Sequence, residues 1–191
     1  MISRPSREFQ LGGRLSLDLT WTLRYRAVRP TELLESPRDL AMWLGRVALP
    51  VSGSLDEPEL SRAKALREAV HRAASAIAER RRIDSRDRQL INRLAAAPPP
   101  APSIGPDGKR RVSPHGGDEF GAALSAIARD AIDLLTAGDG RLRRCEGPRC
   151  SLLFHDGSRP GARRWCATTR CGNRVNTRTY RARKREMADD D

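Results

Sequence analysis

Residues 141–186 read RLRRCEGPRCSLLFHDGSRPGARRWCATTRCGNRVNTRTYRARKRE, and this stretch decides how the rest of the chain is interpreted. It holds fourteen Arg and Lys residues against three acids. It also holds every cysteine of the protein, in two C-x4-C pairs separated by fifteen residues: Cys145, Cys150, Cys166 and Cys171. Four thiols and a dense positive charge in one short segment indicate a metal-stabilised module that binds a polyanion.

The net positive charge of the protein is concentrated in this module. The whole chain of 191 residues carries a formal charge of +12, of which residues 1–140 account for +4. Residues 141–185 carry +12 and residues 186–191 carry −4, so the basic module ends in a short acidic tail. A charge distributed in this way is the footprint of a surface that binds nucleic acid.

We expect the four cysteines to hold one structural Zn²⁺. In a reducing compartment, paired cysteines are metal ligands more often than disulfides. Four thiolates complete a tetrahedron around zinc and leave no open coordination position, which argues against catalysis by the metal. An iron–sulfur or other metal centre and a pair of disulfides remain as alternatives. His155 could replace a ligand, but a position on the surface of a hairpin is favoured for it.

The order of elements predicted within the module is typical of a treble-clef zinc finger. We expect residues 151–154 to form a strand, 156–161 a turn and 163–165 the returning strand. The second cysteine pair then leads into a helix that extends to about Met187. The metal would fold this segment, which is too short to build a core of its own.

The predicted helix after Cys171 carries one continuous basic face. Arg174, Arg178, Arg181 and Arg185 follow one another at helical spacing. Arginine suits bidentate contact to phosphate or to guanine edges, so we expect double-stranded DNA as the partner. The candidate nucleic-acid-binding residues are Arg163, Arg164, Arg174, Arg178, Arg181, Arg183, Lys184 and Arg185.

The first 140 residues predict a mostly helical fold with a small β element, which makes the fold class α+β, mostly α. Caps and apolar spacing predict helices from Pro37 to near Pro50, from Glu57 to about Arg82, from residue 84 or 85, and over 118–137. The second helix has a buried stripe of Leu60, Ala63, Leu66, Val70, Ala73 and Ile77. The Pro- and Gly-rich residues 98–117 predict a loop or a weak hairpin. Alternating apolar residues over 8–26 favour a strand that passes into a helix. A helix is the alternative, because Leu15, Leu19 and Thr22 also fall at helical spacing.

The sequence excludes several classes of protein. It has no run of 18 apolar residues, and its N-terminus has no apolar signal segment, so we expect a cytoplasmic, nucleoid-associated protein without a membrane partner. The three histidines, His71, His115 and His155, are isolated, and we find no Ser/His/Asp set and no phosphate-binding glycine loop. The chain is therefore expected not to be an enzyme.

The residues around the cysteines form a specific pattern: Arg144-Cys145, Cys150, Leu153-Phe154, Asp156, Ser158-Arg159, Arg163-Arg164-Trp165-Cys166, Cys171-Gly172-Asn173-Arg174 and Tyr180-Arg181-Ala182-Arg183. This pattern resembles the CGNR zinc finger, the C-terminal module of a bacterial family of stress-induced transcription regulators. Residues 1–140 resemble the ABATE domain of that family through Gly12-Gly13, Leu17-Asp18-Leu19, Ser36-Pro37-Arg38-Asp39-Leu40, Trp43-Leu44 and Leu66-Arg67-Glu68-Ala69. Members of the family usually have Asn-Thr where this chain has Trp21-Thr22.

The resemblance implies a zinc-dependent DNA-binding transcription regulator built from an ABATE-like sensory or dimerisation domain (1–140), a CGNR-type finger (141–187) and an acidic tail (188–191). The resemblance also leaves open that residues 1–140 bind a small-molecule effector and that the protein forms a homodimer. The alternatives are an RNA- or ribosome-associated protein, since an arginine-rich finger helix can serve either polymer, and a zinc module for protein interaction.

Overall fold

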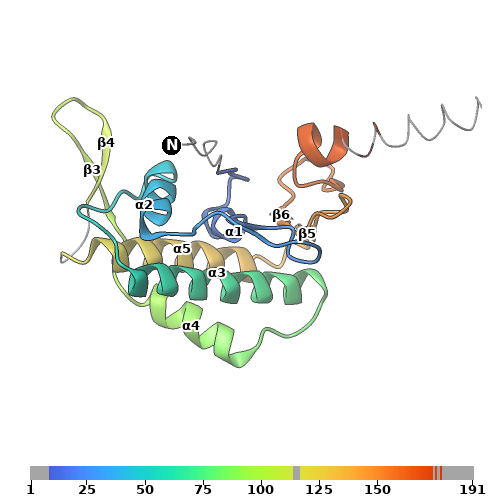
Figure 1. Ribbon diagram of the computed structural model, residues 1–191, viewed down its shortest axis with the longest axis horizontal. Coiled ribbons are helices and arrows are strands. Elements are labelled where there is room, and N and C mark those ends of the chain that lie inside the picture. Colours follow the sequence, from blue (N-terminus) through green and yellow to red (C-terminus); the bar gives the residue numbers. More distant parts are fainter. Residues whose placement is uncertain (1–8, 114–116, 174, 176, 178–191) are drawn as a thin grey trace, which may run out of the picture.

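A computed structural model describes residues 9–113, 117–173, 175 and 177 of the chain (Figure 1). The helices in chain order are α1 (Leu15–Thr20), α2 (Pro37–Arg46), α3 (Glu57–Ala78), α4 (Ser85–Ala95) and α5 (Glu119–Thr136), followed by a π-helical turn, η1 (Thr168–Gly172). The strands that the structure describes form three antiparallel pairs: β1 (Leu23–Arg24) with β2 (Thr31–Glu32), β3 (Ala101–Ile104) with β4 (Arg110–Ser113), and β5 (Leu142–Arg144) with β6 (Leu153–His155). The predicted class, mostly α with small β elements, is confirmed.

Helices α2 and α3 begin with capping boxes. The side chain of Ser36 accepts a hydrogen bond from the backbone N–H of Asp39, and that of Asp56 accepts one from Glu59, with the reciprocal bonds also present. Each cap provides hydrogen-bond acceptors for N–H groups of the first turn that have no partner within the helix. A cap of this kind stabilises a helix by about 1 kcal/mol. Helix α3 is shorter than predicted. It ends at Ala78, and Arg80 then adopts a left-handed conformation (φ 56°) that stops the helix before Arg82.

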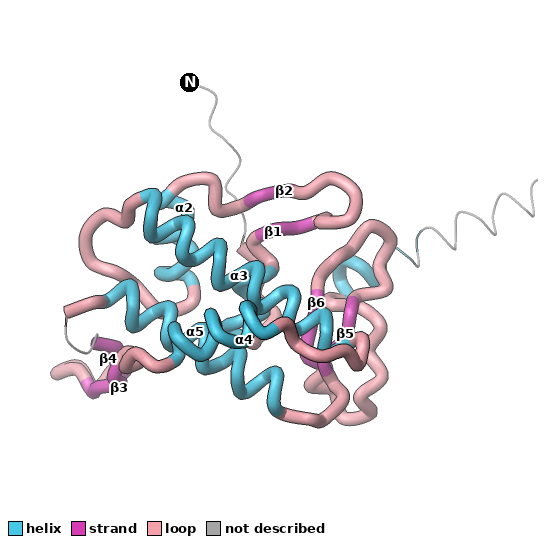
Figure 2. The backbone as a smooth tube through the Cα atoms, turned by 90° about the horizontal axis from the view of Figure 1, so that it is seen from below, coloured by secondary structure: helices cyan, strands magenta, loops and turns pink. Residues whose placement is uncertain are grey.

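Helix α3 is the centre of a helical body, by which we mean residues 9–113 and 117–138. It packs against α1, α2, α4 and α5, and Figure 2 shows α2, α4 and α5 gathered around it. Trp43 and Leu44 of α2, Leu66 of α3 and Leu124 of α5 are fully buried in the shared core. None of the helices in the described part of the chain has both the length and the apolar character needed to cross a bilayer.

The strand-to-helix prediction for residues 8–26 is wrong, because α1 comes first and the short strand β1 follows it. The apolar Leu17 and Leu19 are buried, but so are the intervening Ser16, Asp18 and Thr20. An alternating pattern indicates a strand only when one face meets solvent. Here the polar residues are buried too and find partners inside the protein, such as the bond of 2.5 Å from Ser16 Oγ to Asp130 Oδ2.

The weak hairpin predicted within residues 98–117 is present as β3 and β4. Its turn contains Pro106-Asp107-Gly108, where Gly108 has a φ of +71° that suits glycine. This hairpin and the cysteine module lie at opposite ends of the helical body (Figures 1 and 2). The turn after α5 leads through Gly138 (φ +64°) directly into β5 of the module.

Candidate metal centre

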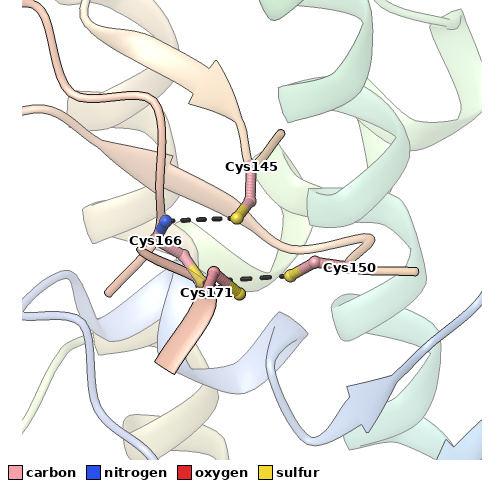
Figure 3. A group of neighbouring side chains, drawn as sticks. All are labelled: Cys145, Cys150, Cys166 and Cys171. Atoms are coloured by element: carbon pink, nitrogen blue, oxygen red, sulfur yellow. Dashed lines mark hydrogen bonds between the residues drawn. The ribbon is translucent and has the colours of Figure 1, made fainter. Parts of the chain in front are cut away.

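The four cysteine side chains converge on one point (Figure 3). Cys145 directly follows β5, Cys150 precedes β6, Cys166 precedes η1 and Cys171 lies within η1. Their sulfur atoms all lie within 4.8 Å of one another. The Sγ of Cys166 is 3.9 Å from that of Cys150 and 3.7 Å from that of Cys171.

These distances fit a tetrahedral zinc site. Sulfurs placed about 2.3 Å from a central zinc ion lie about 3.8 Å from one another in a regular tetrahedron. Cys145, Cys166 and Cys171 are buried and Cys150 is half-buried, and none of the four is in a disulfide. The residues thus supply a closed set of four soft ligands, which is the arrangement of a structural zinc site.

Electrostatics inside the cluster also favour a metal dication. Hydrogen bonds from the thiols of Cys150 and Cys166 lower the pKa of Cys145. Hydrogen bonding to Cys145 raises the pKa of Cys150 to about 12, and bonds to Cys145 and Cys150, together with burial, raise the pKa of Cys166. Four thiolates therefore do not coexist here without a counter-charge, and a bound Zn²⁺ would supply it.

Backbone N–H groups surround the sulfur of Cys145. The N–H groups of Gly147 and Cys166 lie 3.4 Å and 3.3 Å from the Sγ of Cys145. A Cβ added at Gly147 would lie 2.8 Å from the Sγ of Cys171 and 3.3 Å from the Cβ of Cys150. The loop between the first two cysteines therefore needs glycine at this position. Gly147 is not among the residues predicted from the sequence, although a glycine between two closely spaced ligands could have indicated it.

The predicted pairing of strands within the module is wrong. Strand β6 pairs with β5, so the first cysteine pair lies in the turn of this hairpin, and residues 163–165 do not form a strand. The reason is the buried carboxylate of Asp156, which accepts bonds from the N–H of Ser158 (3.0 Å) and of Arg163 (2.8 Å). The loop closes around this carboxylate, which leaves the backbone of residue 163 bonded to it and not to β6.

His155 is not part of the cysteine cluster. Its Nε2 lies 2.8 Å from the Oδ2 of Asp139, which comes after α5. The hydrogen bond from His155, followed by one from the N–H of Arg141, lowers the pKa of Asp139. The favoured interpretation of His155 as a residue outside the ligand set agrees with this geometry.

The two described candidates for nucleic-acid contact differ in their surroundings. Arg163 is half-buried, donates to the carbonyl of Cys166 (2.9 Å) and lies over the ring of Phe154. Arg164 is exposed and pairs with Glu146 at 2.6 Å. The other candidates lie outside the described residues: Arg174, Arg178, Arg181, Arg183, Lys184 and Arg185.

The module is packed onto the helical body through a tryptophan whose packing role was not predicted from the sequence. Trp21, which follows α1, is 4% exposed and packs against Cys145, Leu152 and Phe154. Its Nε1 donates a hydrogen bond of 2.7 Å to the carbonyl of Leu153. Nothing local in the sequence marks this contact.

A chain of polar contacts supports the same junction. Arg67 of α3 is almost fully buried and forms a bidentate pair with Glu32 at 2.7 Å. Arg67 also bonds to Glu68, and Glu68 pairs with Arg26. The backbone N–H of Arg26 then donates to Ser151 Oγ, next to Cys150, at 3.0 Å. Polar contacts thus run from the middle of α3 to Ser151, the residue that follows the ligand Cys150.

Comparison with known proteins agrees with this geometry. A family model described as "putative stress-induced transcription regulator" (ABATE) matches residues 13–138, and one described as "CGNR zinc finger" matches residues 141–184. No curated protein matches the sequence. The two models match adjoining stretches, and the four cysteines within the second fit one structural zinc site. The chain belongs to the ABATE family and carries a CGNR zinc finger.

Proposed function

We propose that this protein is a zinc-dependent, DNA-binding transcription regulator. In this proposal the zinc finger contacts double-stranded DNA, and the helical body receives a signal or mediates self-association. The family description supports the regulatory role, and the closed four-cysteine site supports a zinc ion that folds the finger without catalysing a reaction. We also propose a cytoplasmic, nucleoid-associated location.

The observation that carries the proposal is the unbalanced charge on the finger. Arg149, Arg159 and Arg170 are exposed, and none of them pairs with an acid within the described part of the chain. Arg149 lies in the turn between the first two ligands, with a left-handed backbone (φ 64°). Unpaired arginines that are concentrated in one small module repel one another, and phosphate groups would supply the counter-charge.

The proposed contact surface continues into the segment after η1. The sequence there adds Arg174, Arg178, Arg181, Arg183, Lys184 and Arg185, with Arg163 and Arg164 before it. These residues remain candidates from their spacing and charge. Arg149, Arg159 and Arg170 add to the candidate nucleic-acid-binding residues that were predicted from the sequence.

Charge reversal on the finger tests the proposal. We expect Arg149→Glu/Arg170→Glu and Arg178→Glu/Arg181→Glu each to weaken binding of a mixed-sequence duplex, measured by fluorescence anisotropy across salt. Each lost phosphate contact should reduce the slope of log K against log salt by about 0.9. Arg86→Glu/Arg88→Glu on α4 is the matched control, because both residues are exposed on the helical body and the net charge changes by the same amount. Zinc content and circular dichroism verify that every variant is folded.

The outcome also separates the alternatives. Unchanged affinity and slope in both double variants would contradict a role for the finger in DNA binding. Competition with structured RNA and with heparin is the second arm of the experiment. If the protein binds the duplex, the RNA and heparin equally tightly, and if salt alone governs the affinity, the result would favour a nonspecific or RNA-linked role over sequence-specific regulation. Sedimentation analysis tests the proposed self-association.

A further inference from the structure

A cleft of about 440 Å³ lies where the finger meets the helical body. It is lined by the C-terminal ends of α3 and α5 and by β5, at the end of the helical body nearest the finger (Figure 1). Its volume is in the range of about 300–1,000 Å³ that is typical of small-molecule sites, which are common where two structural units meet.

One part of the cleft wall is apolar. Leu134 and Leu135 of α5 line it, together with Ile77 of α3. Ile77 belongs to the stripe that the sequence predicted to be buried, yet it is 36% exposed. The last residue of the apolar stripe of α3 therefore lines the cleft and is not buried in the core. An apolar wall of this kind favours a ligand with an apolar portion.

The rest of the lining is positively charged. Four arginines line the cleft against two acids, and both acids have partners that are not part of the lining: Asp139 with His155, and Glu146 with Arg164. Arg144 pairs with Glu79. The lining therefore carries more positive than negative charge, and its arginines without an ion pair among the described residues are Arg80, Arg143 and Arg163.

Arg80 and Arg143 are the two arginines best placed to bind an anion. Within the described residues, neither forms an ion pair, although hydrogen bonds, and after them the nearby charge of Arg143, lower the pKa of the buried carboxylate of Asp156. Both arginines line the cleft, and charge-assisted hydrogen bonds from their guanidinium groups would hold an anion there. The third arginine, Arg163, already donates to the carbonyl of Cys166.

We propose that this cleft binds a small organic anion that has a short apolar body, such as a carboxylate or a phosphate ester with an aliphatic or aromatic group. The arginines hold the charged head, and Ile77, Leu134 and Leu135 contact the body. The phosphodiester backbone of DNA has no such apolar portion, so the lining suits a small molecule better than nucleic acid. The ligand touches α3, α5 and β5 at once, so its binding stabilises the packing of the finger on the helical body.

The idea that the ligand of this cleft acts as a signal rests on the proposed regulatory function. The binding of an organic anion to the cleft does not depend on that function. We therefore test it in the absence of DNA. The probe is octanoate, titrated into the full zinc-loaded chain while backbone amide shifts are followed by NMR. Inorganic phosphate supplies the charge without the body, and 1-octanol supplies the body without the charge.

We expect octanoate to shift the amides of residues 77–80 and 134–144 in a saturable way, and to bind at least about tenfold more tightly than phosphate or octanol. Arg80→Glu, at an exposed position, and Arg143→Gln should each weaken octanoate binding by about tenfold or more, which corresponds to about 1.4 kcal/mol. Arg88→Glu should bind octanoate like the unaltered protein.

Three results would overturn the proposal. In the first, phosphate binds as tightly as octanoate, which would reduce the cleft to a patch of charge. In the second, octanoate shifts amides elsewhere, or Arg88→Glu weakens binding as much as Arg80→Glu. In the third, duplex DNA displaces octanoate while shifting the same amides, which would assign the cleft to the nucleic-acid surface. Loss of DNA binding by the finger variants, with octanoate binding intact, would leave this inference standing.

Discussion

The indole Nε1 of Trp21 donates a hydrogen bond of 2.7 Å to the carbonyl oxygen of Leu153, across 132 residues of chain. Trp21 belongs to the helical body, and Leu153 lies on β6 between the two cysteine pairs. The side chain of Leu153 in turn packs in a cluster with Leu17 and Leu134 of the helical body. The zinc finger is therefore built on the helical body and shares buried surface with it.

We predict that Trp21→Phe lowers the free energy of unfolding of the zinc-loaded protein by about 1–3 kcal/mol, because it leaves the buried carbonyl of Leu153 without its donor. Urea unfolding followed by circular dichroism measures the change. Trp165→Phe is the matched control, since Trp165 is half-buried and its Nε1 has no hydrogen-bond partner among the described residues. Equal effects of the two substitutions would show that the hydrogen bond of Trp21 has no special role.

Removal of zinc should unfold the finger and also lower the melting temperature of the helical body. The main helical core contains no residue of the finger, so the helices should persist. Trp21, however, would lose the buried cysteines, Leu152 and Phe154 that surround it. Far-ultraviolet circular dichroism before and after chelation should therefore show retained helix that melts at a lower temperature.

The same result is expected from Cys166→Ser, with zinc content measured by mass spectrometry. His155→Ala is the control, because His155 contacts Asp139 and not the cysteine cluster, and it should retain one zinc per chain. Retention of stoichiometric zinc by Cys166→Ser would contradict the assignment of the ligands. An unchanged melting temperature would contradict the shared core.

Gly147→Ala should weaken zinc binding by about tenfold or more, as expected when the groups that orient metal ligands are disturbed. The added Cβ would lie 2.8 Å from the Sγ of Cys171, so the ligand or the loop must move. Competition with a chromophoric chelator measures the affinity. Gly157→Ala adds the same methyl group in the same module where nothing lies within 4 Å, and it should bind zinc normally. Similar affinities for the two variants would refute the steric role of Gly147.

The features that the sequence predicted well are those that local chemistry determines. The capping boxes at Ser36 and Asp56 are contained within four residues, so α2 and α3 begin where the sequence predicts. The zinc cluster was predictable because Cys145, Cys150, Cys166 and Cys171 stand in two regular pairs.

The features that the sequence did not predict depend on contacts between distant residues. Residues 15–24 alternate like a strand, but the helical body surrounds α1 and buries both its apolar and its polar side chains. The pairing of β6 with β5 depends on the loop around Asp156, and the role of Trp21 depends on a contact with Leu153. Spacing along the chain does not report such contacts, because they form only when the finger packs on the helical body.

Asp18 is a buried carboxylate whose charge should cost stability at neutral pH. It is 5% exposed, accepts a hydrogen bond from the N–H of Gly12 and lies near Asp130. Burial raises the pKa of Asp18 to about 6 from 3.8, against the opposing effect of the bond from Gly12. Between about pH 4 and pH 6 the folded protein therefore holds a proton that the unfolded chain has released, so this group's contribution to stability falls as the pH rises.

We therefore predict that Asp18→Asn, which keeps an oxygen acceptor for Gly12 but never ionises, becomes more stable relative to the unaltered protein as the pH rises. The difference in free energy of unfolding should grow through the window from pH 4 to 6 and level off above it, by up to about 3 kcal/mol. Urea unfolding of both proteins at matched pH values measures it, and subtraction removes the contribution of acids with lowered pKa values, such as Glu68. A flat difference for Asp18→Asn would mean that Asp18 ionises in the folded protein as readily as in the unfolded chain.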